Sequence, residues 1–165
     1  MAEPINAKQV MTHPIYCLAF GLGSGLAPKA PGTFGTLLAI PLFWFMASWP
    51  MLGYLAAVVF LAAIGIYLCG ETARALHIHD HPGIVWDEIV GYLIAMIPLS
   101  NDWRAMLLGF ALFRFFDIIK PWPIKWADAK VKGGLGIMLD DIIAGIFAAI
   151  LGGLIWSFGQ QQVWF

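Results

Sequence analysis

Apolar residues dominate this chain in long stretches that are separated by short polar segments. The stretch from Ala30 to Gly70 contains no charged residue. Its length is roughly twice the ~20 residues that cross the hydrocarbon core of a membrane once. A Ser-Trp-Pro sequence at 48–50 interrupts it, and tryptophan is enriched at the membrane–water interface. The pattern therefore predicts two membrane spans, at about 35–49 and 51–70.

Three further apolar stretches follow a polar segment at 71–82. They predict spans at about 84–98, 103–119 and 140–158, and the segment 120–139 is predicted to be a loop because it contains prolines and several glycines. The whole pattern predicts an all-α integral membrane bundle of about five apolar segments, preceded by a glycine-rich N-terminal loop.

The composition agrees with a membrane protein. Hydrophobic residues make up 61% of the 165 residues, with eight tryptophans and twelve phenylalanines. A soluble domain of this size buries only about two-thirds of its unfolded surface, so the excess apolar residues are expected to face lipid. We expect a single membrane-embedded domain at 14–158, between tails at 1–13 and 159–165. The nine basic and ten acidic residues form no footprint for nucleic acid, and membrane lipids are the expected partners.

Basic residues fall almost entirely on one side of the predicted membrane. Because successive spans alternate in direction, the segment before the first span shares its side with 71–83 and 119–139. Arg104 is predicted to lie on the opposite side, and the other eight basic residues on this one: Lys8, Lys29, Arg74, Arg114, Lys120, Lys125, Lys130 and Lys132. The positive-inside rule predicts that this side is cytoplasmic.

Five carboxylates are predicted to lie at that same side, at the ends of three apolar stretches: Asp87, Glu88, Asp117, Asp140 and Asp141. A carboxylate at the bilayer centre costs about 2.5–3.5 kcal/mol, so a group of them indicates a function. Oxygen ligands without cysteine favour Mg²⁺ or Mn²⁺ over zinc, and all five acids are candidate metal ligands and catalytic residues. The alternative for the two adjacent pairs is helix capping, because acids satisfy the free amides at helix N-termini.

Basic and glycine-rich segments near these acids supply groups that bind phosphate. Arg114 is a candidate catalytic residue and phosphate ligand, because its planar guanidinium matches phosphate oxygens. It could instead pair with Asp117, three residues later on the same helix face. Lys120 is a further candidate phosphate ligand. The glycine-rich loop 21–36 predicts either an anion-binding nest or a re-entrant turn. Its candidate phosphate ligands are Ser24, Lys29 and Thr33.

Three alternating histidines lie in the polar segment: His77, His79 and His81. An extended backbone would place them on one side, which allows a zinc site. His79 or His81 could also donate a proton, but a polar loop without a catalytic role is the simpler interpretation.

Four motifs occur in a fixed order: GSGLAPKAPGTFGT (23–36), HDHPGIVWDEIVG (79–91), FRFFDIIKPWPI (113–124) and GGLGIMLDDIIAG (133–145). Through them the chain resembles the phosphatidylglycerophosphatase A family, membrane phosphatases of bacterial phosphatidylglycerol synthesis, over roughly residues 14–158. The resemblance implies Mg²⁺-dependent hydrolysis of phosphatidylglycerophosphate to phosphatidylglycerol and inorganic phosphate. It also implies a multi-pass protein of the bacterial inner membrane, and the positive-inside rule then turns the active site toward the cytoplasm. The acidic motifs of the family match the five carboxylates, without assigning a role to each.

The residue chemistry suggests a mechanism in which the metal binds the terminal phosphate and activates a water molecule. Arg114, with Lys29 or Lys120, would neutralise the developing charge, and a carboxylate not bound to metal would be the general base. A covalent aspartyl-phosphate is the mechanistic alternative. The alternatives in function are a phosphatase of another phospholipid phosphate, an ion or metabolite transporter, and an assembly subunit. Transporter sites usually lie near the membrane midplane in repeated halves, whereas these acids lie at one face and the chain shows no repeat.

Overall fold

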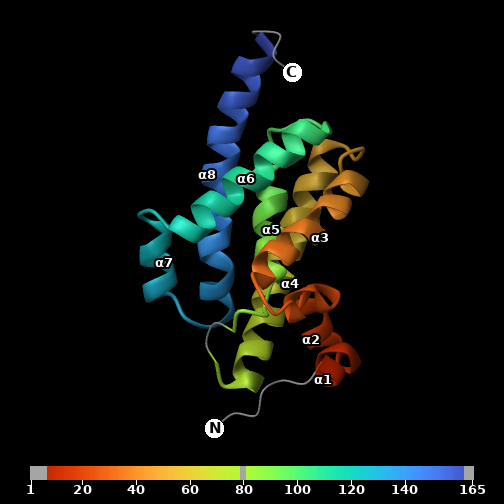
Figure 1. Cartoon of the computed structure of the whole chain (residues 1–165), viewed down its shortest axis with the longest axis vertical. Coiled ribbons are helices and arrows are strands. Elements are labelled where there is room, and N and C mark those ends of the chain that lie inside the picture. Colours follow the sequence, from red (N-terminus) through yellow and green to blue (C-terminus); the bar gives the residue numbers. More distant parts are fainter. Residues whose placement is uncertain (1–6, 79–80, 162–165) are drawn as a thin grey trace.

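The structure, a computed structural model, describes residues 7–78 and 81–161. All regular secondary structure in these two ranges is helical (Figure 1). In chain order the elements are α1 (Ala7–Thr12), α2 (Pro14–Ala19), the 3-10 helix η1 (Gly21–Leu26), α3 (Pro31–Met46), α4 (Met51–Leu76), α5 (Trp86–Ala95), α6 (Trp103–Ile119), α7 (Ile124–Lys130) and α8 (Gly133–Gln161). The prediction of an all-α fold is confirmed.

Local sequence signals explain several helix boundaries. Pro31 is the first residue of α3, where its missing N–H would have no partner in any case. Pro50 immediately precedes α4, so the predicted break at 48–50 is present. Asp102 caps α6, because its side chain accepts a hydrogen bond from the Arg104 N–H at 2.8 Å. Consequently α6 begins and ends where the apolar pattern predicts.

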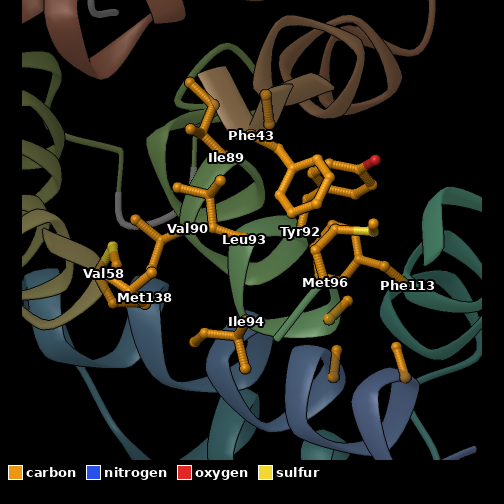
Figure 2. Close-up of a cluster of buried hydrophobic side chains, with 14 of the residues drawn as sticks. Phe43, Val58, Ile89, Val90, Tyr92, Leu93, Ile94, Met96, Phe113 and Met138 are labelled. Atoms are coloured by element: carbon orange, nitrogen blue, oxygen red, sulfur yellow. The ribbon is translucent and has the colours of Figure 1, made fainter. Parts of the chain in front are cut away.

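The helix α8 packs against α4, α5, α6 and α7. The short helix α5 lies between α8, α3, α4 and α6, and every residue from Ile89 to Ala95 is buried. Figure 2 shows its side chains pointing toward Phe43 of α3, Val58 of α4 and Phe113 of α6. The backbones of α5 and α8 approach closely at Gly91 and Gly145. A side chain at Gly145 would collide with the Gly91 carbonyl, so glycine is needed there.

Within residues 7–78 and 81–161, two helices, α4 and α8, are long and apolar enough to cross a membrane. α3 is a shorter apolar helix of 16 residues, and α5, with 10 residues, extends only ~15 Å. This is about half the ~30 Å hydrocarbon core, so the predicted count of five spans is not confirmed. The stretch 84–98 is apolar because it is surrounded by other helices, and an apolar pattern alone does not distinguish such a helix from a lipid-facing one.

Large apolar side chains also cover much of the outer surface. Trp44, Leu52, Phe60 and Phe158 are each at least 65% exposed, on three different helices. Exposed apolar area on this scale marks contact with another apolar phase, which agrees with the prediction that the excess apolar residues face lipid.

The structure corrects two predicted loops. The polar segment 71–82 is partly helical, because α4 continues to Leu76. The segment 120–139 contains all of α7 and the first seven residues of α8, which begins at Gly133 rather than near residue 140. α1 lies within the segment predicted as an N-terminal tail. The domain limits at 14–158 stay a prediction.

Candidate active site

One end of the bundle contains a cavity of about 360 Å³. The starts of α3, α5 and α8 and the end of α6 meet there, and α7 contributes to one edge. Six carboxylates and two basic side chains are among the described residues that line it: Asp87, Glu88, Asp117, Asp128, Asp140, Asp141, Arg114 and Lys120. The structure thus brings all five predicted acids, from three helices, to one end of the molecule.

The two acids of α5 lie in its first turn, and the preceding chain fixes where that turn lies. Gly25 of η1 packs against Gly83 so closely that a side chain at Gly25 would collide with the Gly83 carbonyl. The Val85 N–H donates a hydrogen bond to the Ala19 carbonyl at 2.9 Å. The glycine-rich segment therefore packs against the chain that leads into α5. Glycine is required where two backbones touch in this way.

Asp140 and Asp141 lie about two turns inside α8, which begins at Gly133. The capping alternative is therefore wrong for this pair, because a cap residue precedes the first turn. Both side chains are buried, with exposed fractions of 6% and 3%. Buried carboxylates are costly without a compensating cation, so their position indicates a site rather than a helix end. In α5 the N-cap residue is Val85, and Asp87 and Glu88 lie in the first turn. Their negative charges can still interact favourably with the helix dipole there.

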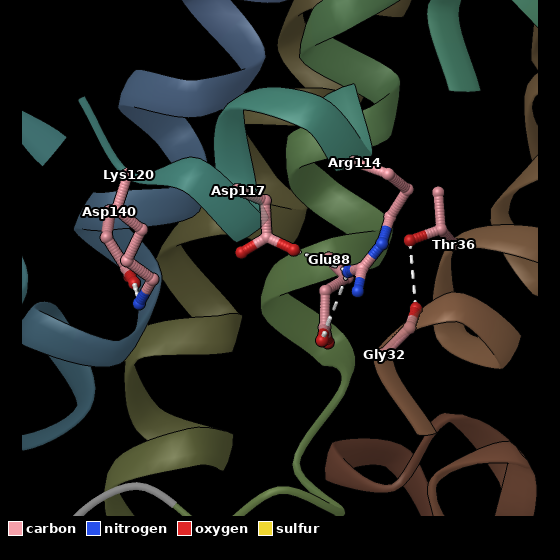
Figure 3. A network of polar contacts seen from close by, with 7 residues as sticks. All are labelled: Gly32, Thr36, Glu88, Arg114, Asp117, Lys120 and Asp140. Atoms are coloured by element: carbon pink, nitrogen blue, oxygen red, sulfur yellow. Dashed lines mark hydrogen bonds and ion pairs between the residues drawn. The ribbon is translucent and has the colours of Figure 1, made fainter. Parts of the chain in front are cut away.

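Arg114 of α6 pairs with two carboxylates, one on its own helix and one on α5. Its Nη1 lies 2.5 Å from Asp117 Oδ2 and 3.8 Å from Glu88 Oε1 (Figure 3). The pairing with Asp117 that the spacing allowed is present, and the contact with Glu88 adds a link between helices. Gly32, at the start of α3, borders this pair, because a side chain there would collide with the Glu88 carboxylate.

Lys120 follows the last residue of α6 and reaches across to α8. Its Nζ donates a hydrogen bond to Asp140 Oδ2 at 2.6 Å and lies 3.2 Å from Asp128 Oδ1. Burial lowers the pKa of this ammonium group, but the hydrogen bond and charge of Asp140, with those of Asp128, raise it above its usual value overall. Lys120 is therefore positively charged at neutral pH.

Asp128 lines the cavity but was not among the predicted site residues. It lies on α7, in a segment predicted as a loop. The signal that could have found it is the spacing of Ile124, Ala127 and Asp128, which places them on one face of a helix. Ile124 and Ala127 are fully buried, so that face is turned toward the protein.

The carboxylates fit a divalent cation. Asp87, Glu88 and Asp141 each offer one oxygen, and these three atoms lie within 4.8 Å of one another. They belong to α5 and α8, whose close approach makes this meeting possible. Oxygen donors are the ligands that Mg²⁺, Mn²⁺ and Ca²⁺ prefer. Asp117, a neighbour of Asp141, and Asp140 flank the three-carboxylate cluster.

Three predicted phosphate ligands lie away from the cavity lining. Lys29 is exposed, Ser24 belongs to η1, and Thr33 is half-buried in the first turn of α3. Their contact with phosphate stays a prediction. Of the histidines, His81 accepts a hydrogen bond from the Gly83 N–H at 3.0 Å, which gives it a place in the loop before α5. His77 caps the end of α4, and His79 lies outside the described residues.

The fold and the site together define a class: an all-helical protein with two helices able to cross a membrane and a cavity of buried carboxylates and basic side chains. The sequence matches the family model of phosphatidylglycerophosphatase A over residues 17–156. The chain belongs to this family of phosphatases and is an enzyme.

Curated relatives agree with the family match. Phosphatidylglycerophosphatase A of Escherichia coli K12 is 46% identical over 157 residues, which cover 94% of this chain and 90% of the relative. The protein of the same name from Haemophilus influenzae is 45% identical over 156 residues, 92% of this chain and 94% of the relative. A Bacteroides thetaiotaomicron relative, whose name refers to a phosphatidylinositol-3-phosphatase, is 36% identical over 138 residues, 79% of this chain and 86% of the relative. No solved structure matches the chain.

Proposed function

We propose that this protein hydrolyses phosphatidylglycerophosphate to phosphatidylglycerol and inorganic phosphate, and that Mg²⁺ is the cofactor. The observation that carries the proposal is the meeting, in one cavity, of a buried three-carboxylate cluster with Arg114 and Lys120. The carboxylates suit a metal and the two basic side chains suit phosphate oxygens. Membership of the family supports the lipid substrate.

Asp87, Glu88 and Asp141 are the residues that would hold the cation. When bound there, the cation would neutralise charge on the phosphate oxygens and lower the pKa of a coordinated water. The same three side chains come from two helices, α5 and α8, whose backbones approach closely at Gly91 and Gly145, so small shifts between α5 and α8 would change the spacing of the ligand oxygens.

The side chains of the protein then bind the phosphate and move the protons. Arg114 and Lys120 donate to its non-bridging oxygens, where negative charge develops. The water oxygen forms a bond to phosphorus, and the bond from phosphorus to the glycerol oxygen breaks. The proton of the water passes to a carboxylate outside the three-carboxylate cluster, Asp117 or Asp140. The departing glycerol oxygen takes up a proton from solvent, which completes the hydroxyl group of phosphatidylglycerol.

The lipid substrate suggests how the protein lies in the membrane. The long apolar helices α4 and α8 and the exposed apolar surface support embedding in a bilayer. We propose a multi-pass position in the bacterial inner membrane. The basic residues gathered toward the cavity end favour a cytoplasmic active site by the positive-inside rule.

The direct test is release of inorganic phosphate from phosphatidylglycerophosphate in detergent micelles with Mg²⁺. We expect EDTA to abolish it, and Asp87→Asn and Asp141→Asn to reduce kcat on the order of 10²–10³-fold, the loss typical of removing one electrostatic element of a catalytic site. Glu71→Gln is the matched control, because Glu71 forms an exposed pair with Arg74 on α4 and does not line the cavity. Full activity in both aspartate variants would overturn the proposal.

The same assay tests the nearest alternative substrate class. Phosphatidylinositol 3-phosphate is the comparison, because a relative carries the name of a phosphatase for it. We expect kcat/KM for phosphatidylglycerophosphate to be at least tenfold higher, which corresponds to about 1.4 kcal/mol of transition-state discrimination. The reverse order would assign the site to another phospholipid phosphate.

A further inference from the structure

Asp128 lies at the edge of the cavity and pairs there with Lys120. It lies on the short helix α7, its side chain is 41% exposed, and its Oδ1 is 3.2 Å from Lys120 Nζ. The three-carboxylate cluster that fits a cation does not include it. Its position therefore needs an explanation other than metal binding, and its ion pair with Lys120 provides one.

The backbone directs Lys120 to this place. Lys120 ends α6 in the left-handed conformation, with φ of 45°, which a residue with a side chain adopts at a cost and glycine adopts freely. The turn sends the chain on toward α7 and leaves the lysine facing Asp140 of α8, 2.6 Å away. A lysine at this position is consistent with a need for its side chain in the cavity.

α7 holds Asp128 in reach of that side chain. Ile124 and Ala127 on the same helix are fully buried, and α7 packs against α8. Lys120 consequently lies between two carboxylates on two different helices, Asp140 inside the cavity and Asp128 at its edge. An ammonium group has three N–H donors, so these two acids leave one donor for a further oxygen.

We propose that Asp128 is a positioning residue, which holds the Lys120 ammonium at the edge of the cavity so that it can bind a phosphate oxygen of the substrate. The inference rests on the proposed phosphatase function. When phosphate arrives, Lys120 exchanges its bond to Asp140 for one to the phosphate while its bond to Asp128 keeps it in place. Without the bond to Asp128, the flexible Lys120 side chain would stay bound to Asp140 or turn toward solvent. The ammonium group would then be correctly placed in a smaller fraction of the protein molecules.

A double-mutant cycle tests this with purified full-length protein in detergent micelles of phosphatidylglycerophosphate. A partly exposed ion pair contributes about 0.2–1 kcal/mol, so Asp128→Asn is expected to raise KM about two- to fivefold and to change kcat less than twofold. Lys120→Gln is expected to have the larger effect. In the double variant, Asp128→Asn should add nothing to Lys120→Gln, because the aspartate acts through the lysine. Asp128→Glu should restore much of the lost affinity, and Glu71→Gln should leave KM unchanged.

A second measurement needs no turnover. The metal-free protein is heated with and without inorganic phosphate, and the shift in Tm reports phosphate binding. We expect this shift to be smaller in Asp128→Asn than in wild type, and equal in Lys120→Gln and the double variant. An unchanged KM and Tm shift in Asp128→Asn, or an effect of equal size in the Lys120→Gln background, would overturn the inference. Absence of phosphate release by the wild type would overturn the proposed function instead, and the phosphate-dependent Tm shift would still decide the role of Asp128.

Discussion

At the scale of single residues, the cavity contains more negative than positive side chains. Six carboxylates line it among the described residues, and Arg114 and Lys120 supply its basic groups. Asp117 and Glu88 share Arg114, and Asp128 and Asp140 share Lys120. Asp141, which is 3% exposed, forms an ion pair with neither of these two basic side chains. Such an arrangement positions carboxylates to bind a cation, and it lowers the stability of the folded protein when no cation is bound.

Asp141→Asn is therefore expected to raise the thermal stability of the metal-free protein while it removes activity. The amide keeps the shape of the side chain but carries no charge to repel its neighbours, and one to two kcal/mol would raise Tm by several degrees. Thermal unfolding in detergent with EDTA measures this. Glu71→Gln, which removes a partly exposed carboxylate that does not line the cavity, should change Tm by less than about 1 °C. A lower Tm for Asp141→Asn would show that the carboxylate is structurally required.

At the scale of helices, the start of α3 is part of the site although it supplies no charged side chain. Ala30, Pro31 and Gly32 line the cavity, and Gly32 leaves the space that the Glu88 carboxylate occupies beside Arg114. Residues 21–36, which include this element, were predicted to form either an anion-binding nest or a re-entrant turn. In the structure its glycines allow close packing around the acids of α5.

Gly32→Ala tests that role. The added methyl group would displace Glu88 or Arg114, and a misplaced catalytic group can cost on the order of 10²-fold in rate. We expect kcat/KM for phosphate release to fall by at least tenfold with little loss of folded protein, because the displaced groups are ends of side chains rather than backbone. Gly53→Ala in α4 is the matched control, since no atom lies within 4 Å of the added methyl group. Equal activity in the two variants would mean that α3 does not shape the site.

The comparison of prediction and structure is also clearest at this scale. The apolar pattern predicts α6 at its observed limits, because Asp102 and a short polar turn mark its start. It misplaces the start of α8, since Gly133, Gly134 and Gly136 are poor helix formers. The packing of α8 against α4 explains these glycines, because a side chain at Gly134 would collide with the Ile66 carbonyl of α4. The five acids could be predicted because charges are rare in this sequence. Asp128 was missed because the spacing that marks it lies in a seven-residue helix, which has no long periodic pattern.

At the scale of the whole molecule, α3, α4, α6 and α8 place the cavity at one end and the turns at 47–50 and 99–102 at the other. Helix α5 ends inside this bundle, and its residues are covered by neighbouring helices rather than exposed. The two ends should therefore face opposite sides of the membrane, with the lysine-rich end in the cytoplasm.

Cysteine labelling measures this orientation. Lys130→Cys at the cavity end and Asn101→Cys at the other end are both exposed positions, and Cys17 and Cys69 are first replaced by serine and alanine. In intact bacterial cells with a permeabilised outer membrane, a membrane-impermeant maleimide should label Asn101→Cys and leave Lys130→Cys unlabelled. Inverted membrane vesicles should give the opposite pattern. Labelling of both positions from the same side would rule out this orientation.

Asp141 is 3% exposed, so the phosphate of a substrate has to enter the cavity to meet it. A phosphate group at the end of a slender linker can enter while the bulkier parts of the substrate stay outside. A phosphate attached directly to a large rigid group would be stopped before it met the acids. We therefore expect the burial of the acids to select substrates by the length and width of what carries the phosphate, independently of any contact with the lipid chains.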